Sequence, residues 1–272
     1  MPRRGRVGSV EAMTTRRAVV TGASSGIGEA TVRALRAGGW DVVGVARRAE
    51  RLARLDEEIG SVSFAADLTV SADVDALAEH LEKTGPVHAL VHIAGGARGT
   101  DRVEDGDPDD WRWMFEVNVL SAQLVTAALL PLLRQASVDG HADTLYVTST
   151  AAQTAYPGGA GYNAAKAGES MLVHALRLEL NGEPIRVTEI APGMVQTEEF
   201  TLNRLGGDRA GAERVYEGVA EPLTAEDVAD VIAYALNAPG HVNLDLVTMR
   251  PVAQSAQHLL ARGPLRPRLN LD

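Results

Sequence analysis

Short apolar runs alternate along this chain with longer stretches in which apolar residues recur at helical spacing. The runs are rich in β-branched residues and end at Gly, Pro or polar residues, which is typical of strands. They lie at 18–21, 41–46, 62–65, 89–93, 144–148, 186–190 and 244–249, with helical stretches at 28–37, 72–83, 114–133, 161–180 and 225–235. This alternation predicts an α/β fold of βαβ units around a seven-stranded parallel sheet. Because the strands are apolar throughout, we expect helices on both faces of the sheet.

The alternation continues without a second domain or an internal repeat, so the 272 residues predict one domain, over 16–258. Residues 1–15 carry arginines but no apolar segment of a secretory signal, and we expect a disordered extension there. The stretch 194–223 interrupts the pattern; long insertions are usually functional lids or disordered, and we interpret this one as a substrate loop. Residues 259–272 form a predicted C-terminal tail. No run approaches the length of a membrane span.

The composition narrows the possible partners. The chain has 26 Lys and Arg against 36 Asp and Glu, a net charge of −10, which argues against nucleic acid or an anionic membrane as the main partner. Cysteine is absent, which excludes disulfides, thiol nucleophiles and thiolate metal sites. A reducing compartment is compatible with this, and we expect a cytoplasmic protein that acts on a small molecule.

A glycine-rich segment joins the first predicted strand to the first predicted helix. Gly22, Gly26 and Gly28 stand where a backbone must approach a pyrophosphate closely, and the start of the helix adds a partial positive charge. A tight turn would explain Gly22 but not all three glycines. The sequence therefore predicts a dinucleotide cradle, formed by Gly22, Ser24, Ser25, Gly26, Ile27 and Gly28.

Arg47 and Arg48 follow the second predicted strand, at the position that selects between the two nicotinamide dinucleotides. An acidic residue there would bind a free ribose 2′-hydroxyl, whereas two guanidiniums favour a 2′-phosphate. We therefore expect NADP rather than NAD. The alternative is that both arginines only begin a solvated helix.

Two further pairs of residues follow the third and fourth predicted strands. Asp67 and Leu68 are expected beside the adenine, where Asp67 can accept from the amino group; a role at a helix N-terminus is the alternative for Asp67. Ala94 and Gly95 leave room for the adenosine ribose.

Tyr162 and Lys166 are four residues apart on one predicted helix and so share a face. A phenol titrates near 10, roughly, when isolated, and an adjacent ammonium stabilises its anion. The pair predicts that Tyr162 is a proton donor whose pKa is adjusted by Lys166, although such a spacing also arises by chance. Ser149, thirteen residues before Tyr162, supports the catalytic interpretation.

With the glycine-rich loop, Asn118, Ser149, Tyr162 and Lys166 in this order, the chain resembles the short-chain dehydrogenase/reductase family over roughly 16–258. The resemblance implies a single Rossmann-like, doubly wound domain that binds NAD(P) at the carboxyl ends of its strands and forms a homotetramer or homodimer. It also implies that Ser149 polarises a substrate carbonyl and Tyr162 protonates the alkoxide. Lys166 would hold the nicotinamide ribose and lower the pKa of Tyr162, and Asn118 would support a proton-relay water.

After the sixth predicted strand, a Pro-Gly segment matches the family's nicotinamide-binding turn. The resemblance implies that the carboxamide is held by Pro192, Gly193, Val195 and Thr197. A Pro-Gly turn alone is ordinary in loops.

One departure from the family lies in the fourth predicted strand, where His92 and Ile93 replace the usual Asn-Asn. The first Asn normally ties strands together; His92 can do so with one ring nitrogen, and Ile93 cannot. His88 and His92 are four apart but have no carboxylate partners, and we expect no metal site.

The last third of the chain carries several short segments in a recognisable order, at 197–204, 206–208, 215–216, 223–228, 241–245 and 250–255. With these segments it resembles NADP-dependent 3-hydroxy acid dehydrogenases, of the serine and 3-hydroxypropionate type, and clavaldehyde-type reductases. This resemblance implies a small 3-hydroxy acid and its 3-oxo form as substrates, with Arg204 as a clamp for the carboxylate. Arg204 can equally be a surface residue of a mobile loop. Other interpretations are a reductase of a bulky ketone or aldehyde, such as a polyketide, a steroid or an acyl carrier thioester, and a non-catalytic NADP-binding regulatory protein.

Overall fold

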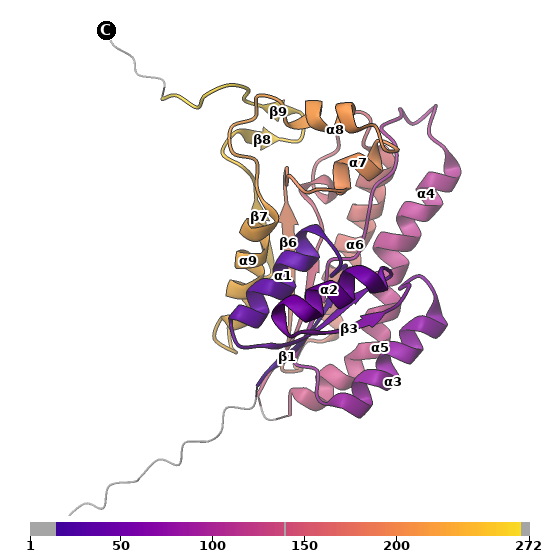
Figure 1. Cartoon of the computed structure of the whole chain (residues 1–272), viewed down its shortest axis with the longest axis vertical. Helices are drawn as coiled ribbons and strands as arrows, with labels where there is room; N and C mark the ends of the chain where they lie inside the picture. Colours follow the sequence, from indigo (N-terminus) through magenta and orange to yellow (C-terminus); the bar gives the residue numbers. More distant parts are fainter. Residues whose placement is uncertain (1–14, 139, 268–272) are drawn as a thin grey trace, which may run out of the picture.

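The computed structural model describes residues 15–138 and 140–267. Seven strands pair in parallel in the order β3-β2-β1-β4-β5-β6-β7 (Figure 1), which confirms the predicted Rossmann-like, doubly wound sheet. They are β1 (Arg17–Thr21), β2 (Asp41–Ala46), β3 (Val62–Ala65), β4 (Ala89–His92), β5 (Ala142–Val147), β6 (Ile185–Pro192) and β7 (Leu246–Met249). The sequence pattern located all seven because each is a short apolar run; the five inner strands are buried, and the edge strands β3 and β7 are only partly covered.

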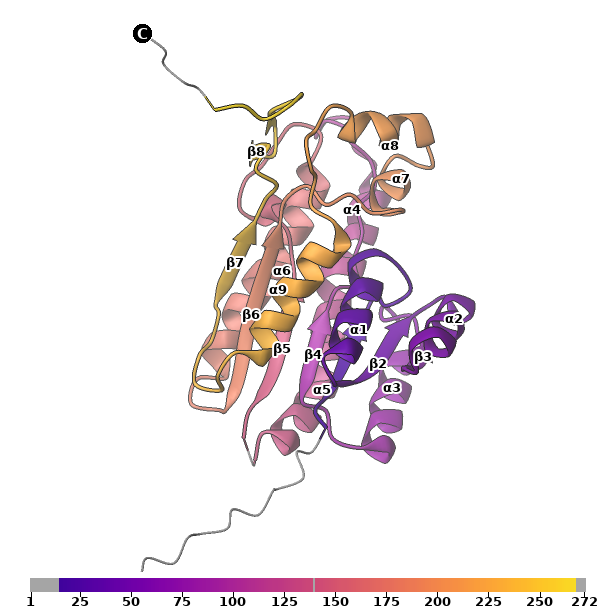
Figure 2. The same cartoon turned by 60° about the vertical axis from the view of Figure 1, so that its left-hand side comes forward.

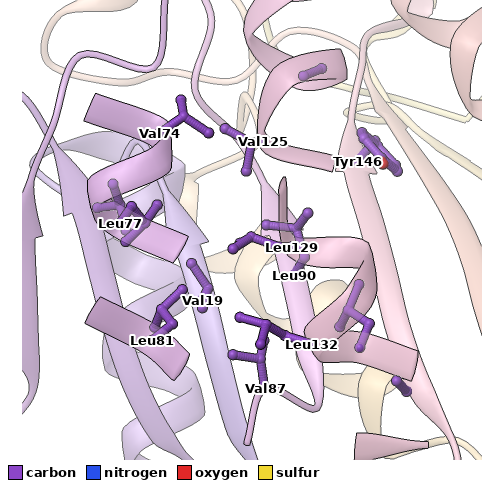
Figure 3. Packing of buried hydrophobic residues seen from close by; sticks show 14 of the residues in the cluster. Val19, Val74, Leu77, Leu81, Val87, Leu90, Val125, Leu129, Leu132 and Tyr146 are labelled. Atoms are coloured by element: carbon purple, nitrogen blue, oxygen red, sulfur yellow. The ribbon is translucent and has the colours of Figure 1, made fainter. Parts of the chain in front are cut away.

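Helices cover both faces of the sheet (Figure 2). On one face lie α1 (Gly26–Ala37), α2 (Ala49–Ile59) and α9 (Ala225–Asn237). On the other lie α3 (Ser71–Thr84), α5 (Ser121–Ala136) and α6 (Ala160–Glu179). Figure 3 shows the second core from close by: leucines of α3 and α5, such as Leu77 and Leu129, pack beside Val19 of β1 and Leu90 of β4. This packing fixes the sheet from which the site residues project.

One predicted helix begins much earlier in the structure than the sequence indicated. It runs from α4 (Pro108–Phe115) through η1 (Glu116–Leu120), a turn of π-helix, into α5. The run has 29 residues, and the mean hydropathy of its most apolar 18-residue window is 1.5, so by length and composition it could cross a membrane and the expectation that no run approaches that length is wrong. Half of its most apolar window, 50%, is buried in the domain, where α5 packs on β4 and β5 as a core helix does.

The stretch 194–223 holds two short helices, α7 (Phe200–Arg204) and α8 (Arg209–Tyr216). They lie above the carboxyl end of the sheet (Figure 1), next to a small hairpin of β8 (Gln254–Ala256) and β9 (Leu259–Leu260). The hairpin crosses the predicted border at 258 between the domain and its tail. The predicted disordered extension at 1–15 lies, except for its last residue, outside the described residues.

His92 ties strands β1 and β4 together, as the sequence indicated. The hydroxyl oxygen of Thr21 accepts hydrogen bonds from the backbone N–H groups of Ile93 (2.9 Å) and Ala94 (3.0 Å) and lies 2.8 Å from Nδ1 of His92. Since this oxygen already accepts two bonds, its proton is donated to Nδ1 of His92, which leaves the ring proton on Nε2. His88 has a different partner, the backbone N–H of Arg17, which donates to its Nδ1 at 3.1 Å.

Candidate active site

Three positions of the glycine-rich turn between β1 and α1 require glycine. Gly22 and Gly26 have φ angles of 70° and 52°, in the left-handed region that favours glycine. A Cβ on Gly28 would lie 2.1 Å from the carbonyl oxygen of Gly22, so the helix packs on the strand only with glycine there. Two of the first three residues of α1 thus present backbone without a side chain, which fits the pyrophosphate of a dinucleotide.

Two predicted catalytic residues leave no space for a side chain at Gly95, which follows β4. A Cβ there would lie 2.5 Å from Oδ1 of Asn118 and 3.4 Å from Nζ of Lys166. A Cβ on Gly22, in the glycine-rich turn after β1, would meet the backbone nitrogen of Ala94 at 3.1 Å. The two turns therefore approach each other at the carboxyl ends of β1 and β4, where the ribose is expected.

A cavity of about 580 Å³ opens at this end of the sheet, between the glycine-rich turn and the 194–223 segment. It is large enough for part of a cofactor and a small substrate. The predicted site residues that line it are Gly22, Ser25, Gly26, Ile27, Gly28, Ser149, Tyr162, Pro192, Gly193, Val195, Thr197 and Arg204. Asn118 and Lys166 are not among the lining residues and lie buried next to it.

A second cavity of about 240 Å³ adjoins the first and holds the predicted adenosine site. Its lining includes Gly22, Ser24, Ser25, Arg47, Arg48, Asp67, Leu68 and Ala94. Oδ1 of Asp67 accepts from the backbone N–H and the hydroxyl of Thr69, at 3.0 and 2.7 Å. Although burial acts to raise it, the pKa of Asp67 is lowered by these bonds and by Arg47. Asp67 thus shapes its own turn before α3 as well as facing the cavity.

The two arginines after β2 differ in their surroundings. Arg47 is exposed at the second cavity. The guanidinium of Arg48 instead donates to the hydroxyls of Ser24 and Ser25, both at 2.9 Å from Nη2. It also pairs with Glu199 of the 194–223 segment, at 2.7 Å. Positive charge therefore stands where the 2′-phosphate of NADP is expected.

Tyr162 projects from the first turn of α6 into the large cavity, and 8% of it is exposed. Its ring lies edge-on to Phe200, with 5.6 Å between the centroids. Burial raises the pKa of the Tyr162 phenol above its ordinary value, while the Lys166 ammonium and the Ser149 hydroxyl act to lower it. The lowering by Lys166 that the resemblance implied is present, but burial outweighs it.

Lys166 is buried beneath Tyr162 on the same helix. Its Nζ donates to the carbonyl oxygen of Val147 at 3.2 Å and to Oε2 of Glu169 at 2.6 Å. Burial acts to lower the pKa of Lys166, but Glu169 and Tyr162 raise it, so the ammonium form is favoured. The amine is therefore a fixed positive charge beside the phenol.

Asn118 lies in the π-helical turn η1 and is fully buried. Its Nδ2 donates to the carbonyl oxygens of Gly96 and Met114, at 2.9 and 2.7 Å, and its Oδ1 accepts from the N–H of Gly96 at 3.2 Å. These bonds fix Asn118 against the turn after β4. Its role toward a relay water stays a prediction.

Ser149 and the Pro-Gly turn flank the cavity at the ends of β5 and β6. The Ser149 hydroxyl accepts from the N–H of Ala151 at 3.1 Å, which orients it at the start of η2 (Thr150–Ala152). After β6, Gln254 closes on the turn: its Oε1 accepts from the N–H of Met194 at 2.8 Å. A Cβ on Gly193 would lie 2.3 Å from the same oxygen, so Gly193 is needed for this contact.

Arg204 reaches the cavity from α7 rather than standing free on a loop. Its guanidinium lies over the ring of Tyr162, 5.6 Å from the centroid. Nε, Nη1 and Nη2 donate to the Gly99 carbonyl (3.2 Å), the Tyr156 hydroxyl (2.8 Å) and the Gly158 carbonyl (3.0 Å). Of the five N–H groups of an arginine, one on each Nη is left for a ligand.

The sequence interpretation missed several residues at the site. Tyr156 and Phe200 line the large cavity, Glu199 lines both cavities, and Glu169 binds Lys166. A signal existed only for Glu169, because three residues after Lys166 on a helix is the same face. The others are brought in by loops and short helices, whose course the pattern does not reveal.

Comparison with known proteins agrees with this geometry. The family model for short chain dehydrogenase matches residues 16–204. An uncharacterized oxidoreductase of Mycobacterium tuberculosis is 51% identical to this chain, over 92% of it and 96% of the relative. Serine 3-dehydrogenase of Rhizobium radiobacter is 38% identical, over 87% of this chain and 94% of the relative.

Among solved structures, the closed form of serine dehydrogenase complexed with NADP+ is similar, with a TM-score of 0.85 and 32% identity. The match covers 91% of this chain and all, 100%, of that one. The predicted likeness to enzymes of the 3-hydroxy acid type is thus confirmed as a relationship of sequence and structure. The chain belongs to the short-chain dehydrogenase family and is an oxidoreductase that acts on CH–OH groups with NAD(P) as acceptor.

Proposed function

We propose that this enzyme is an NADP-dependent dehydrogenase of a small 3-hydroxy acid, which interconverts it with the 3-oxo acid. The position of Arg204 supports this most directly: its guanidinium lies 5.6 Å from the ring centroid of Tyr162, inside the cavity. A carboxylate bound to the two remaining N–H groups would place the hydroxyl of a three-carbon acid near the phenol. The serine dehydrogenase likeness supports the same substrate class.

The residues around the cavity supply the proton chemistry. Reduction of a carbonyl builds negative charge on its oxygen, which needs a hydrogen-bond donor and a proton in place. In this proposal Ser149 donates a hydrogen bond to that oxygen and Tyr162 donates the proton, while the Lys166 ammonium stabilises the phenolate that remains. When bound, the nicotinamide cofactor supplies or accepts the hydride.

The preference for NADP over NAD is part of the proposal. The glycine turns fit a dinucleotide because a Cβ at Gly28 or Gly95 would collide with the chain. Arg47 and Arg48 then stand at the second cavity, and the sequence has no acidic residue directly after β2, although Glu199 of the 194–223 segment pairs with Arg48 there. The NADP+ complex of the similar serine dehydrogenase supports this choice.

A substrate panel tests the proposal. Oxidation of L-serine, 3-hydroxypropionate and 3-hydroxybutyrate with NADP+, and reduction of bulky ketones with NADPH, are compared in the wild type and in Arg204→Ala. We expect turnover of an acid and a rise of its KM by about 10- to 100-fold in the variant, from loss of a charge-assisted pair. Arg209→Ala, which changes an exposed arginine of α8, is the matched control.

Two different results of the substrate panel would each indicate another function. Turnover of bulky ketones only, unaffected by Arg204→Ala, would identify a ketone or aldehyde reductase. Tight NADPH binding without turnover of any carbonyl compound would support a regulatory protein on this fold.

A further inference from the structure

A buried carboxylate lies directly beside Lys166, and the proposed proton chemistry does not use it. Glu169 is one helical turn further along α6, and its side chain is 1% exposed. Its Oε2 accepts from Nζ of Lys166 at 2.6 Å, and its Oε1 is buried with no hydrogen-bond partner among the described residues. A buried acid without full compensation is costly and calls for a reason.

A second buried carboxylate, Glu189 on β6, stands in the same part of the core. It accepts from the hydroxyls of Thr148 (2.7 Å) and Ser170 (3.0 Å), and its Oε2 lies 3.1 Å from Nε2 of His174. Glu189 makes no ion pair with Lys166 among the described residues, although it acts on the lysine at longer range and raises its pKa.

The other groups that face Glu169 are few. From β5 come the Val147 carbonyl, which accepts from Lys166, and the buried phenol of Tyr146, whose pKa is raised by burial and also by Glu169. The phenol of Tyr162 faces it from the start of α6. Among the described residues the region thus holds two carboxylates and one ammonium, with His174 beside Glu189 and the buried His92 near Lys166 as the imidazoles.

Glu169 and Lys166 act in opposite directions on Tyr162. After burial, which raises it most, the Lys166 ammonium lowers the pKa of the phenol, and the Glu169 carboxylate raises it again. A carboxylate 2.6 Å from the ammonium therefore neutralises part of the charge that the phenol would otherwise experience.

We propose that Glu169 is a positioning residue for Tyr162 and Lys166: its carboxylate anchors the Lys166 ammonium against α6 and offsets part of the charge presented to the phenol, which keeps Tyr162 a proton donor. The inference rests on the proposed function, in which Tyr162 is the acid and base of the reaction. It adds that the reduction direction, where Tyr162 must carry its proton, is favoured by the ionised form of Glu169.

The titration of Glu169 itself sets the range in which this operates. Burial raises the pKa of Glu169 to about 7, against the opposing effect of Lys166 and with a further rise from Glu189. Above that pH the carboxylate is ionised and Tyr162 holds its proton more strongly. Below it Glu169 is neutral, and the Lys166 ammonium then lowers the pKa of the Tyr162 phenol without being offset by Glu169.

The experiment measures the ionisation of Tyr162 without any substrate. Tyrosinate absorbance is followed against pH in the wild type and in Tyr162→Phe, and the difference between the two curves gives the titration of Tyr162. The same pair is measured with Glu169→Gln added, which keeps an oxygen acceptor for Nζ and removes only the charge. Glu189 stays as a counterion for Lys166.

We expect the Tyr162 titration to move to lower pH by about one unit in Glu169→Gln, a roughly tenfold increase in its ionisation constant. Glu189→Gln, equally buried but not in contact with Nζ, is the matched control and should move it far less. Glu169→Asp, which restores the charge, should return most of the shift. If Glu169→Gln does not fold, Glu169→Met, of similar volume and no charge, carries the same expectation.

A titration that stays in place or moves to higher pH in the neutral variants would overturn the proposal. If substrates are found, the alkaline limb of kcat/KM for alcohol oxidation should move by the same amount in Glu169→Gln. If none is turned over but the titration moves as expected, the role of Glu169 stands and the proposed function fails.

Discussion

Nη1 of Arg48 lies 2.7 Å from Oε1 of Glu199, and Nη2 of Arg51 lies 2.8 Å from the same oxygen. The ion pair between Arg48 and Glu199 joins the turn after β2, where a 2′-phosphate is expected, to the residue before α7 of the 194–223 segment. Arg48 lowers the pKa of Glu199, against the opposing effect of burial, so the carboxylate is ionised at neutral pH. The cofactor site and the substrate segment are thus in electrostatic contact.

We expect Glu199→Gln to tighten NADPH binding. The carboxylate competes with a phosphate for Arg48 and Arg51, and it repels the phosphate charge. For a partly exposed pair this is worth about 1 kcal/mol, so the Kd of NADPH should fall about fivefold while that of NADH stays constant. Fluorescence titration of both cofactors measures the ratio.

Glu198→Gln provides the matched control for that experiment. Its carboxylate is the neighbouring one, 76% exposed and 3.7 Å from Arg51, and it makes no ion pair with Arg48 among the described residues. It should leave both Kd values within about twofold. Weaker NADPH binding in Glu199→Gln would instead mean that the carboxylate holds the site together.

Arg47→Ala should weaken NADPH far more than NADH. The side chain is exposed at the second cavity, where a guanidinium can pair with a 2′-phosphate but has nothing to gain from a hydroxyl. A charge-assisted bond of this kind predicts a rise in the NADPH Kd of about tenfold or more. Arg54→Ala, at an exposed position on the following helix α2, is the control, and equal loss for both cofactors would contradict the NADP assignment.

Tyr162→Phe should abolish turnover and leave NADPH affinity unchanged. The phenol is the only group of the cavity that the proposal asks to give a proton, and loss of a positioned acid reduces kcat by roughly 100- to 10,000-fold. Single-turnover kinetics and cofactor titration separate the two effects. Tyr156→Phe removes another hydroxyl of the same cavity, one that binds Arg204, and should change KM more than kcat. A Tyr162→Phe enzyme with its full rate would rule out the acid role.

The sheet and the cofactor turn were predictable because each depends on local pattern. Apolar runs that end at polar residues locate β1 to β7, and three glycines between a strand and a helix locate the cradle. By contrast α2 was expected only as the solvated helix of the alternative for Arg47 and Arg48, since only Leu52 and Leu55 of its residues are buried and its apolar stripe is narrow. Helices α7 and α8 are too short for a helical period to show.

The contacts of the site were less predictable than its residues. Spacing placed Tyr162 and Lys166 on one face, but it does not show that burial raises the pKa of Tyr162 overall. Nor does it show that Arg204 uses three of its N–H groups on its own chain, because that depends on how 194–223 folds over the cavity. Glu169 is one charge among many until the core around it is seen.

The family resemblance implies a homotetramer or homodimer, and we propose that a second copy of the chain covers the outer face of α4 and α6. Phe115 lies against Gly168 of α6, and Met171 and Leu178 follow on the same helix, seven residues apart, with 64% and 78% of their surface exposed. Met171→Glu should then reduce the mass found by light scattering. Val252→Glu, at an apolar residue 90% exposed elsewhere, should not.

His92 should make the fold sensitive to acid, and the sign follows from its burial. Burial, with Lys166 nearby, lowers the pKa of His92 to about 3. The unfolded chain takes up a proton on this residue near its ordinary pKa of 6.5, which the folded protein does not. The contribution of His92 to the free energy of unfolding is therefore fully present above pH 6.5. It is lost as the pH falls from 6.5 toward 3, by about 1.4 kcal/mol for each pH unit.

Replacing His92 by Asn, the residue usual in the family, should remove this loss. Asn can still accept from the Thr21 hydroxyl, but it does not titrate. Denaturant unfolding of both proteins between pH 4 and pH 7 gives the difference in the free energy of unfolding. We expect the wild type to lose more of its free energy of unfolding than His92→Asn as the pH falls. His241→Asn, at an exposed position, is the control. Parallel curves for wild type and His92→Asn would mean that the buried ring is protonated in the folded state.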